Sequence, residues 1–578
     1  MSGNGESGIM TEARIGVFVC HCGSNIAGYL DCEALTRYAE TLPNVVYAKN
    51  NLYTCSESGI AEIQSAIKEH KLTRVVVSSC SPRTHMPLFK SACAEAGLNQ
   101  YLFEMANIRD QCSWVHMHEP EKATEKSKDL VRMAVAKARL LEPLTRRSVA
   151  VNKSALVIGG GISGLTAALA LAEQSFDVYL VEKEKELGGH LRHVRYTLNG
   201  EDPQVQLQGA KAQVFKNQRI HLFTGGCVES IDGTSGDFRT KISANGKSSE
   251  IKHGVVIVAI GAKQYEPAEY RYAQDARVLT QRELEQRLAS GDPFLLPNRN
   301  RAARSVVMIQ CVGSREDAHP YCSRVCCSEA IKNALMIKTV SPETHVYVLY
   351  RDIRTYGFKE SYYTEARKRG VMFVRYNETA KPQVAPNGHG LEVVVTDQTL
   401  GMPMSISADF VVLSAGIHPD EGNKLIAQFL KIPLNAEGFF LEAHMKLRPV
   451  DFMTDGVFLC GLAHSPKSVA ESILQAQAAA SRAATILSRD TIDMEANISE
   501  VVDANCDGCA YCVDTCPFKA ITLLEYMWQG SVKKSVEANE TVCKGCGCCQ
   551  ATCPKKGVLI RGFTLDQIEA QIHAALGV

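Results

Sequence analysis

The sequence predicts an α/β protein of several domains, in which parallel sheets form most of the chain and a small cysteine-rich domain ends it. Three observations predict this. A glycine-rich turn lies between an apolar strand-like run and a helix-like run at residues 154–173. Apolar runs that end at a cysteine recur before residue 81, and two closely spaced cysteine runs follow residue 505. A length of 578 residues is that of three or four ordinary domains.

The composition argues against several classes of function. A hydrophobic content of 45% and a charged content of 22% are typical of a globular protein. The formal net charge is zero and no long basic run occurs, so we expect neither nucleic acid nor an anionic membrane surface as a partner. No apolar run is long enough for a transmembrane helix. The polar start, "MSGNGESGIMTEAR", lacks the apolar core of a signal peptide, so we expect a cytoplasmic protein.

Cysteine is the unusual component. The chain has 22 cysteines, and disulfides are rare in the cytosol, so metal binding or redox chemistry is the better explanation. The cysteines are clustered in the segments 20–112, 311–327 and 506–553, and only Cys227 and Cys460 lie elsewhere. Such clustering is not expected of scattered core residues.

The two runs near the carboxyl end have the spacing of a bacterial ferredoxin, C-x2-C-x2-C-x3-C-P, present twice. Three thiolates of one run wrap one [4Fe–4S] cluster, and the fourth, before proline, reaches the other cluster. The first predicted ligand set is Cys506, Cys509, Cys512 and Cys553. The second is Cys543, Cys546, Cys549 and Cys516. A zinc ribbon has different spacing, and Cys548 is expected to be a bystander.

The last residues, "FTLDQIEAQIHAAL", predict a helix that packs on a neighbouring element. Leu565, Ile568, Ile572 and Leu576 recur at helical spacing and would form its buried face.

A dinucleotide-binding unit is predicted between residues 154 and 182. The run "SALVI" reads as a buried strand, Gly159-x-Gly161-x-x-Gly164 follows, and a helix and a second strand lead to Glu182. The first glycine permits the tight turn, the second admits the pyrophosphate and the third allows close packing of helix on strand. The acid is placed to bind a ribose hydroxyl.

Further glycines recur downstream: Gly188, Gly189, Gly261 and Gly461. With the predicted strands at 253–262 and 454–464, this order resembles the two-dinucleotide-domain flavoproteins such as thioredoxin reductase. The resemblance implies FAD, with the isoalloxazine near 459–461. The chain has Gly461-Leu462 where that family usually has Gly-Asp, so a backbone amide or a neighbouring side chain must serve the flavin there. The alternative is a plain NAD(P)-binding Rossmann domain.

Between the two halves of such a flavin domain, a second glycine fingerprint is expected after the strand at 305–310. The chain has four cysteines instead: Cys311, Cys322, Cys326 and Cys327. A helix is predicted at about 327–339, and further strands at 344–350 and 408–416. Thiolates at a strand end and a helix N-terminus could bind one [4Fe–4S] cluster, whose negative charge the helix dipole favours. The alternative is a redox-active disulfide.

The N-terminal segment predicts strands that end near Cys20, Cys55 and Cys80, with Cys22 close by. The carboxyl ends of parallel strands line one crevice, so these four thiols should converge and bind a fourth [4Fe–4S] cluster. A catalytic or structural thiol pair is the alternative. Three other cysteines fall in helix-like segments and read as small buried side chains: Cys32, Cys93 and Cys112.

Nearly the whole chain resembles the family of HdrA-like iron–sulfur flavoproteins of heterodisulfide reductase. The motifs are "VCHCGSNIAG", "VVVSSCSPRTH", "ANIRDQCSWVH", "VIGGGISGLTAAL", "CVGSRED…YCSRVCC", "RDIRTYG" and the paired ferredoxin runs. The resemblance implies a cytoplasmic FAD and iron–sulfur protein in a dimer of heteromeric units. Implied partners are HdrB- and HdrC-like subunits, ferredoxin, and an electron-input module of the hydrogenase, formate dehydrogenase or NADH dehydrogenase type.

The same resemblance places Lys332, in "CCSEAIK", near the flavin N5, where its ammonium would stabilise anionic flavin. A solvated helix lysine is the alternative for this residue. Many methanogen members carry a ferredoxin insert in the flavoprotein part, and this chain has no such cysteine-rich insert, so at least one electron route differs.

Five domains are expected: an N-terminal α/β iron–sulfur domain at 1–148, a first FAD-binding half at 149–265, a degenerate NAD(P)-like domain with a cluster at 266–420, a second FAD-binding half at 421–492, and a ferredoxin domain with a terminal helix at 493–578. The core would be similar to thioredoxin reductase.

We expect an oxidoreductase that acts as a flavin hub. A two-electron donor, arriving through a partner, would reduce FAD, and single electrons would leave through clusters on different sides, as in electron bifurcation or confurcation. Cluster potentials span roughly −700 to +450 mV, so separate routes can differ in energy. The alternatives are a non-bifurcating conduit and a self-contained NAD(P)H–ferredoxin oxidoreductase, although the missing second glycine fingerprint argues against nicotinamide binding. The sequence leaves the donor, the acceptor and the direction of flow open.

Overall fold

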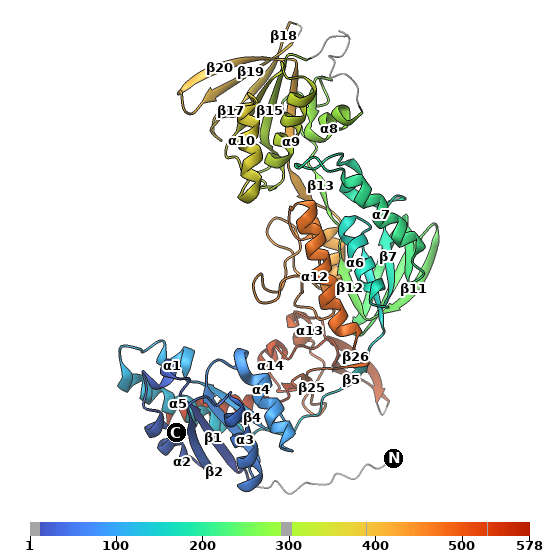
Figure 1. Ribbon diagram of the computed structural model, residues 1–578. Coiled ribbons are helices and arrows are strands. Elements are labelled where there is room, and N and C mark those ends of the chain that lie inside the picture. Colours follow the sequence, from blue (N-terminus) through green and yellow to red (C-terminus); the bar gives the residue numbers. More distant parts are fainter. Residues whose placement is uncertain (1–11, 291–302, 389, 529, 578) are drawn as a thin grey trace. The chain divides into compact units, whose positions relative to one another are not determined.

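The computed structural model describes residues 12–290, 303–388, 390–528 and 530–577 (Figure 1). The polar segment 1–11, which argued against a signal peptide, lies outside the described residues. The chain divides into two compact units, one of residues 1–148 with 493–578 and one of residues 149–492. Among the described helices, none is both long and apolar enough to cross a membrane.

The N-terminal part of the first unit is a four-stranded parallel sheet in the order β2-β1-β3-β4, with helices packed around it. Its strands are β1 (Ile15–Cys20), β2 (Val45–Asn51), β3 (Arg74–Ser79) and β4 (Phe103–Asn107). Its longer helices are α2 (Cys32–Glu40), α3 (Glu57–Glu69), α4 (Pro82–Glu95) and α5 (Pro120–Arg139). Strand β1 is central and wholly buried, which explains its unbroken apolar run.

The C-terminal part of the first unit is small and held by two antiparallel strand pairs. These are β25 (Ser499–Val501) with β28 (Val558–Ile560), and β26 (Ile521–Trp528) with β27 (Ser531–Ala538). Each cysteine run contains one short helix, α13 (Tyr511–Thr515) in the first and α14 (Cys548–Thr552) in the second. Its core combines Ile521, Val536 and Ile560 with Cys512 and Cys549, so cysteines make up part of the packed interior.

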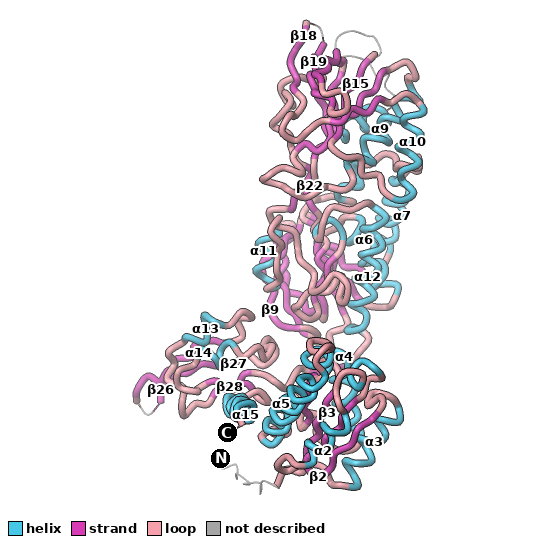
Figure 2. The backbone as a smooth tube through the Cα atoms, turned by 90° about the vertical axis from the view of Figure 1, so that its left-hand side faces the viewer, coloured by secondary structure: helices cyan, strands magenta, loops and turns pink. Residues whose placement is uncertain are grey.

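The terminal helix α15 (Leu565–Leu576) packs on α5, and Figure 2 shows the two helices side by side. The predicted buried face was wrong, because Ile572 and Leu576 are exposed. The most buried residue is Gln567, which completes a capping box with Thr564 and donates to the carbonyl of Leu140. Hydrogen bonds hold this helix in place, so the spacing of its apolar residues does not predict which face is buried.

The second unit contains two five-stranded parallel sheets. The first has the order β23-β12-β6-β7-β8. Its strands are β6 (Ser154–Ile158), β7 (Asp177–Glu182), β8 (Ile220–Thr224), β12 (Val255–Val258) and β23 (Val457–Leu459). Its helices are α6 (Ile162–Glu173), α7 (Pro203–Lys216) and α12 (Val469–Leu487), and an antiparallel sheet of β9 (Gly226–Thr234), β10 (Asp237–Ala244) and β11 (Lys247–His253) is attached.

The second sheet has the order β14-β21-β15-β16-β17. Its strands are β14 (Val278–Thr280), β15 (Ser305–Val312), β16 (His345–Tyr350), β17 (Met372–Arg375) and β21 (Phe410–Ala415). Its helices are α8 (Gln281–Ala289), α9 (Cys326–Val340) and α10 (Glu360–Lys368), with a sheet of β18 (Gln383–Asn387), β19 (Gly390–Asp397) and β20 (Met402–Ala408) beside it. The predicted strand, helix and closing strand around the four cysteines are confirmed to within about two residues.

The two sheets of the second unit are connected through an antiparallel pair, β13 (Ala262–Gln264) with β22 (Ile417–Pro419). Figure 2 shows β22 between them. The helix α11 (Asn423–Leu430) follows β22 and returns the chain to the first sheet. The cysteine-bearing sheet is therefore an insertion between the strands that form the glycine-rich sheet.

Candidate cofactor sites

The glycine-rich turn after β6 has the shape that a dinucleotide requires. Gly159 has a φ of +111°, and a Cβ there would lie 2.3 Å from the carbonyl oxygen of Ala259. A Cβ on Gly164 would lie 1.8 Å from the carbonyl oxygen of Gly159. A Cβ on Gly161 would meet nothing within 4 Å, so open space faces this glycine. That space fits a pyrophosphate at the N-terminus of α6.

Glu182, at the end of β7, is buried behind the turn. Its two carboxylate oxygens accept hydrogen bonds from the amides of Gly160 (2.6 Å) and Glu184 (2.8 Å). Each oxygen keeps a lone pair that a ribose hydroxyl could use. Gly188 pairs with Gly161 in an isolated bridge, and a Cβ on Gly189 would lie 3.2 Å from the Cα of Gly161. The second glycine pair thus packs directly on the first.

The other two predicted glycines differ in their surroundings. Gly261 (φ +79°) faces open space, whereas a Cβ on Gly461 (φ +73°) would lie 2.3 Å from Oγ of Ser163. The amide of Gly461 donates to Oε1 of Gln475 at 2.9 Å. That amide already has a protein partner. Another backbone amide or a neighbouring side chain would therefore have to serve the flavin where the chain has Gly461-Leu462.

The sequence did not predict the buried lysine at this strand end. Nζ of Lys467 donates to the carbonyl oxygens of Gly461 (2.7 Å) and Ser465 (2.8 Å). Burial lowers the pKa of Lys467 to about 8. Nε2 of His464 donates to a carboxylate oxygen of Glu442 at 2.7 Å, and its Nδ1 accepts from the side-chain amide of Gln475 at 2.9 Å. The signal in the sequence was a run of polar residues, "HSPKS", between a buried strand and a helix.

The four cysteines of the second sheet line one cavity. Cys311 has a φ of +63°, where the pairing of β15 with β21 shifts register between Ile309 and Val312. Cys326 and Cys327 begin α9, whose first turn has no side-chain cap. Cys322 lies in the loop before the helix and lines the same cavity. The sequence-predicted ligands are thus together at the carboxyl end of a strand and the N-terminus of a helix.

The cavity disfavours free, uncompensated thiolates. Burial raises the pKa of Cys327 to about 11, and the thiolates of Cys311 and Cys322 contribute. Burial also raises the pKa of Cys326 and of Cys311, although Arg315 and Arg351 lower that of Cys311. Iron would offset the cost of these buried charges.

Unpaired polar atoms beside this cavity fit an electronegative occupant. Within the described residues, Nη1 of Arg315 and both side-chain heteroatoms of Gln310 are buried without a hydrogen-bond partner. Both residues line the cavity. Buried donors normally have partners, and the sulfides and thiolates of a [4Fe–4S] cluster could accept from them.

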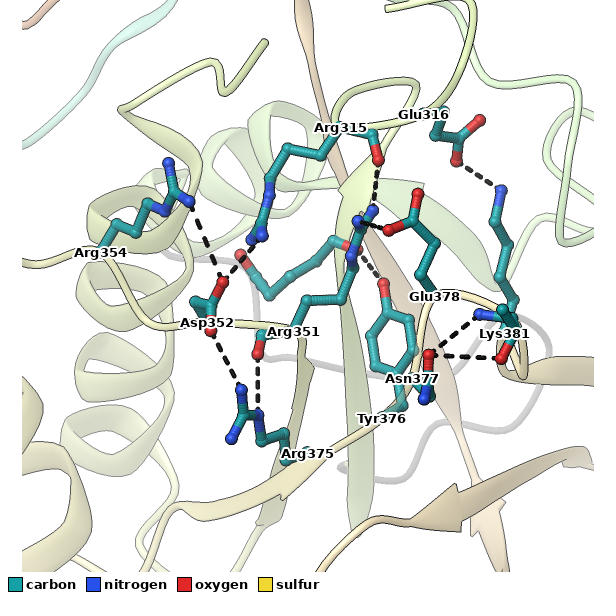
Figure 3. A network of polar contacts seen from close by, with 12 residues as sticks. Arg315, Glu316, Arg351, Asp352, Arg354, Arg375, Tyr376, Asn377, Glu378 and Lys381 are labelled. Carbon is teal, nitrogen blue, oxygen red and sulfur yellow. Dashed lines mark hydrogen bonds and ion pairs between the residues drawn. The ribbon is translucent and has the colours of Figure 1, made fainter. Parts of the chain in front are cut away.

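An arginine network surrounds the same cavity (Figure 3). Asp352 pairs with Arg315 (2.7 Å), Arg375 (3.3 Å) and Arg354 (3.9 Å). Arg351 donates to the carbonyl of Arg315 and pairs with Glu378. Positive charge therefore exceeds negative charge next to the four thiols, which stabilises an anionic cluster.

Lys332 is buried on α9 and is not a solvated helix lysine. Its Nζ pairs with Glu285 at 2.9 Å and donates to the carbonyl of Tyr196 at 2.8 Å. It also lies 5.0 Å from the centroid of the Tyr196 ring. Burial raises the pKa of the neighbouring Glu329 to about 7. The sequence did not predict the ion pair with Glu285, because it depends on contacts between α8 and α9.

The N-terminal sheet gathers its predicted cysteines at the carboxyl ends of its strands. The thiol of Cys20 accepts from the amide of Thr54 at 3.4 Å, and Arg109 donates to Cys22 at 3.8 Å. Burial raises the pKa of Cys55, and the thiolates of Cys20 and Cys22 raise it further. Burial likewise raises the pKa of Cys80, which Arg109 lowers. Cys32, Cys93 and Cys112 are all buried in helical segments, as predicted, and Cys32 also lies near Cys20.

The ferredoxin runs lie against each other in the small C-terminal part. Burial raises the pKa of Cys512 to about 11, with contributions from the thiolates of Cys549, Cys553 and Cys506. Burial raises the pKa of Cys549, with contributions from Cys543 and Cys546. A hydrogen bond to Cys546 raises the pKa of Cys548, to which the thiolate of Cys516 contributes. Each fourth cysteine is thus near the other run, and Cys509 is exposed at the edge.

In the described part of the chain, no three His, Cys, Asp or Glu side chains converge closely enough to bind a single metal ion. The four thiolates of a [4Fe–4S] cluster bind four different irons and therefore stand farther apart. All 22 cysteines are free thiols in this structure.

Comparison with known proteins defines the family. A family model described as an NAD(P)-binding Rossmann-like domain matches residues 157–220, and one described as a 4Fe-4S dicluster domain matches residues 505–557. The chain is 38% identical to the HdrA protein of the H2:CoB-CoM heterodisulfide,ferredoxin reductase of Methanothermobacter thermautotrophicus, over 89% of this chain and 91% of that protein. The chain belongs to the HdrA family of heterodisulfide reductase.

A second member of this family, the HdrA-like protein of Archaeoglobus profundus, is 35% identical over 97% of this chain and 98% of its own length. Among solved structures, Lactococcus lactis thioredoxin reductase aligns with 58% of this chain and 99% of its own length, at 17% identity and a TM-score of 0.41. The Methanothermobacter alignment spans 606 residues, more than the 578 of this chain, so that relative has internal segments absent here.

Family membership makes the chain part of an oxidoreductase. The predicted α/β fold with a Rossmann core and a C-terminal dicluster domain is confirmed. These domains support FAD and [4Fe–4S] clusters as its cofactors, and the open glycine turn and the cysteine-lined cavity fit them.

The glycine turn gives a direct test of cofactor binding. We expect Gly164→Ala to abolish FAD retention and to destabilise the fold by roughly 1–3 kcal/mol, because the new methyl group overlaps the carbonyl of Gly159. FAD per chain after gel filtration and urea unfolding are the measurements. Gly209→Ala, in an open position of α7, is the control and should be neutral or stabilising by about 0.5–1 kcal/mol. Normal FAD content in the Gly164 variant would contradict this placement of the cofactor.

Proposed function

We propose that the chain is a flavin hub in which a [4Fe–4S] cluster occupies the place of a second nucleotide. The observation that carries this proposal is the single cavity lined by Cys311, Cys322, Cys326 and Cys327 at the carboxyl end of β15. In a Rossmann-type sheet this edge is where a nucleotide phosphate binds. A hydride donor placed there would deliver two electrons, whereas a cluster accepts one.

The cofactors supply complementary chemistry, since FAD exchanges two electrons and a cluster exchanges one. The chain's own residues position and tune them. The turn at Gly159, Gly161 and Gly164 would hold the pyrophosphate and Glu182 the ribose, with Gly188 and Gly189 supporting the turn. Gly261 would leave room along the flavin, and Gly461 would allow its strand end to pack closely on Ser163. Lys332 would hold positive charge beside the flavin, and the arginines around Asp352 would stabilise the cluster's negative charge.

We propose four [4Fe–4S] clusters in all. The first is bound by Cys20, Cys22, Cys55 and Cys80, and the second lies in the cavity at 311–327. The other two occupy the ferredoxin runs, with the fourth cysteine of each run exchanged between them. Supporting this, Cys55 and Cys80 each lie within electrostatic reach of Cys20 and Cys22, and Cys553 lies near Cys512.

The proposed partners follow from the relatives. The name of the Methanothermobacter protein mentions dihydrogen, the CoB-CoM heterodisulfide and ferredoxin. For this chain we propose HdrB- and HdrC-like subunits that reduce a disulfide, an electron-input module and ferredoxin, in a dimer of heteromeric units that bifurcates electrons.

Removing two ligands tests the proposed cluster. Cys311→Ser with Cys322→Ser should lower the iron content by about four atoms per chain, since one cubane is lost, while FAD stays bound. Iron and flavin are quantified on the purified, anaerobically reconstituted protein. Cys227→Ser, at an exposed cysteine outside every cluster, is the control and should keep its iron. Unchanged iron in the double variant would refute the proposal.

A second test separates the charge of Lys332 from its structural pairing. Lys332→Met should destabilise the fold by roughly 3–5 kcal/mol, because Glu285 is left buried and unpaired. Adding Glu285→Gln should restore most of this stability. If the ammonium acts on the flavin, the flavin midpoint potential should be lower than that of the wild type in both variants. Lys338→Met, on the same helix, is the control, and recovery of the potential in the double variant would assign Lys332 a structural role only.

A further inference from the structure

A second, open cavity lies outside the cysteine-lined one. It measures about 620 Å³ and is lined by residues of two segments: Cys322 and Arg324, and Ile353, Arg354, Thr355, Tyr356, Glu360 and Tyr363. Cys322, Arg324 and Arg354 line both cavities. A ligand of the proposed cluster therefore forms part of the wall of an open surface cavity, and this cavity gives the cluster a short route to the outside.

Two exposed aromatic residues belong to the segment that forms part of this cavity's rim: Tyr356 lines the cavity, and Phe358 lies two residues further along the chain. Phe358 is fully exposed and Tyr356 is 55% exposed. The hydroxyl of Tyr356 accepts from Arg324 at 2.8 Å, so the rim is tied to the loop that carries Cys322. An apolar side chain that is wholly exposed contributes no burial free energy to the isolated chain. Aromatic residues beside arginines are typical of protein interfaces.

The charge around the rim is mainly positive. Lys359 lies over the ring of Tyr356 and Arg367 over that of Tyr363, at 5.9 and 5.7 Å from the ring centroids. Asp352 is already paired with three arginines, and Glu471 pairs with Arg324. Glu360 is the acid that lines the cavity itself. Such a surface complements an acidic partner.

We propose that this rim, formed by Arg354, Tyr356, Phe358, Lys359 and Arg367, is the docking site of an acidic one-electron carrier protein of the ferredoxin class. The proposal rests on the proposed cluster at 311–327. In the transfer, the reduced carrier loses one electron and its iron–sulfur cluster is oxidised, and the cluster beside Cys322 gains that electron. No bond forms or breaks and no proton moves. The reverse transfer uses the same contact.

The test compares two matched pairs of adjacent Phe-Lys substitutions in the full-length, reconstituted protein. Phe358→Ala with Lys359→Glu alters the rim. Phe215→Ala with Lys216→Glu, on α7, is the control, because Phe215 and Lys216 are also exposed neighbours. Each protein, oxidised, is mixed anaerobically with a reduced acidic ferredoxin, and the second-order rate of its reduction is followed by absorbance over a series of salt concentrations. Reduced methyl viologen, a small cation that needs no docking surface, serves as a second reductant.

At low ionic strength we expect the rim variant to be reduced by ferredoxin at least about tenfold more slowly than the wild type and the control variant. Its rate should also depend less on salt, while the rate with methyl viologen stays unchanged. Equal ferredoxin rates in both variants would overturn the docking proposal and leave the cluster proposal standing. Reduced self-association of the rim variant with an unchanged ferredoxin rate would assign the face to contacts between copies, and would also overturn it. The proposed function would instead be refuted if methyl viologen reduced no cluster that is lost when Cys311 and Cys322 are replaced by serine.

Discussion

Buried thiols at one strand end can ionise together only where positive charge compensates them. This electrostatic constraint explains most of what surrounds Cys311, Cys322, Cys326 and Cys327. Burial, with a contribution from the thiolates of Cys311 and Cys322, raises the pKa of Cys327 to about 11. Three features supply the compensation: arginines paired with Asp352, the uncapped first turn of α9, and buried donors on Arg315 and Gln310 that have no hydrogen-bond partner among the described residues. These features share a preference for a compact anionic group.

The same constraint shapes the backbone. A phosphate loop relies on glycines that bring amides close to a pyrophosphate. Here the chain bends at Cys311 itself, whose left-handed φ breaks the ladder of β15 and turns the thiol into the cavity. Strain of this kind is stored at functional sites. The glycine-rich sheet keeps its nucleotide turn, so the second unit combines one nucleotide site with one cysteine site on similar frames.

Much of this could be predicted from the sequence, because the informative residues are close together in the chain. The strand before Gly159, the strand before Cys311 and the helix from Cys326 follow from local patterns, and so does the pairing of the two ferredoxin runs. The ion pair of Lys332 with Glu285 could not be predicted, since the two residues meet only through tertiary packing. The burial of Lys467 was not predicted either, although its acceptors Gly461 and Ser465 are close to it in the chain. The buried face of α15 was wrong because Gln567 anchors that helix by hydrogen bonds rather than by apolar burial.

The positions of the cysteines also indicate how electrons could enter and leave. Cys322 faces both an inner cavity and an open one, whereas the N-terminal thiols lie at the edge of a separate sheet in the other unit. Distinct cluster environments allow distinct reduction potentials. The proposed division of an electron pair at one flavin would require such a difference in potential between clusters.

The number of iron atoms per FAD in the anaerobically purified full-length protein tests the central claim most directly. Four [4Fe–4S] clusters and one flavin give about sixteen irons per FAD. This ratio, with one FAD per chain, is the predicted result. A ratio of about eight, the value for the two ferredoxin-type clusters alone, would contradict the account, because neither the N-terminal nor the central cysteine site would then bind a cluster.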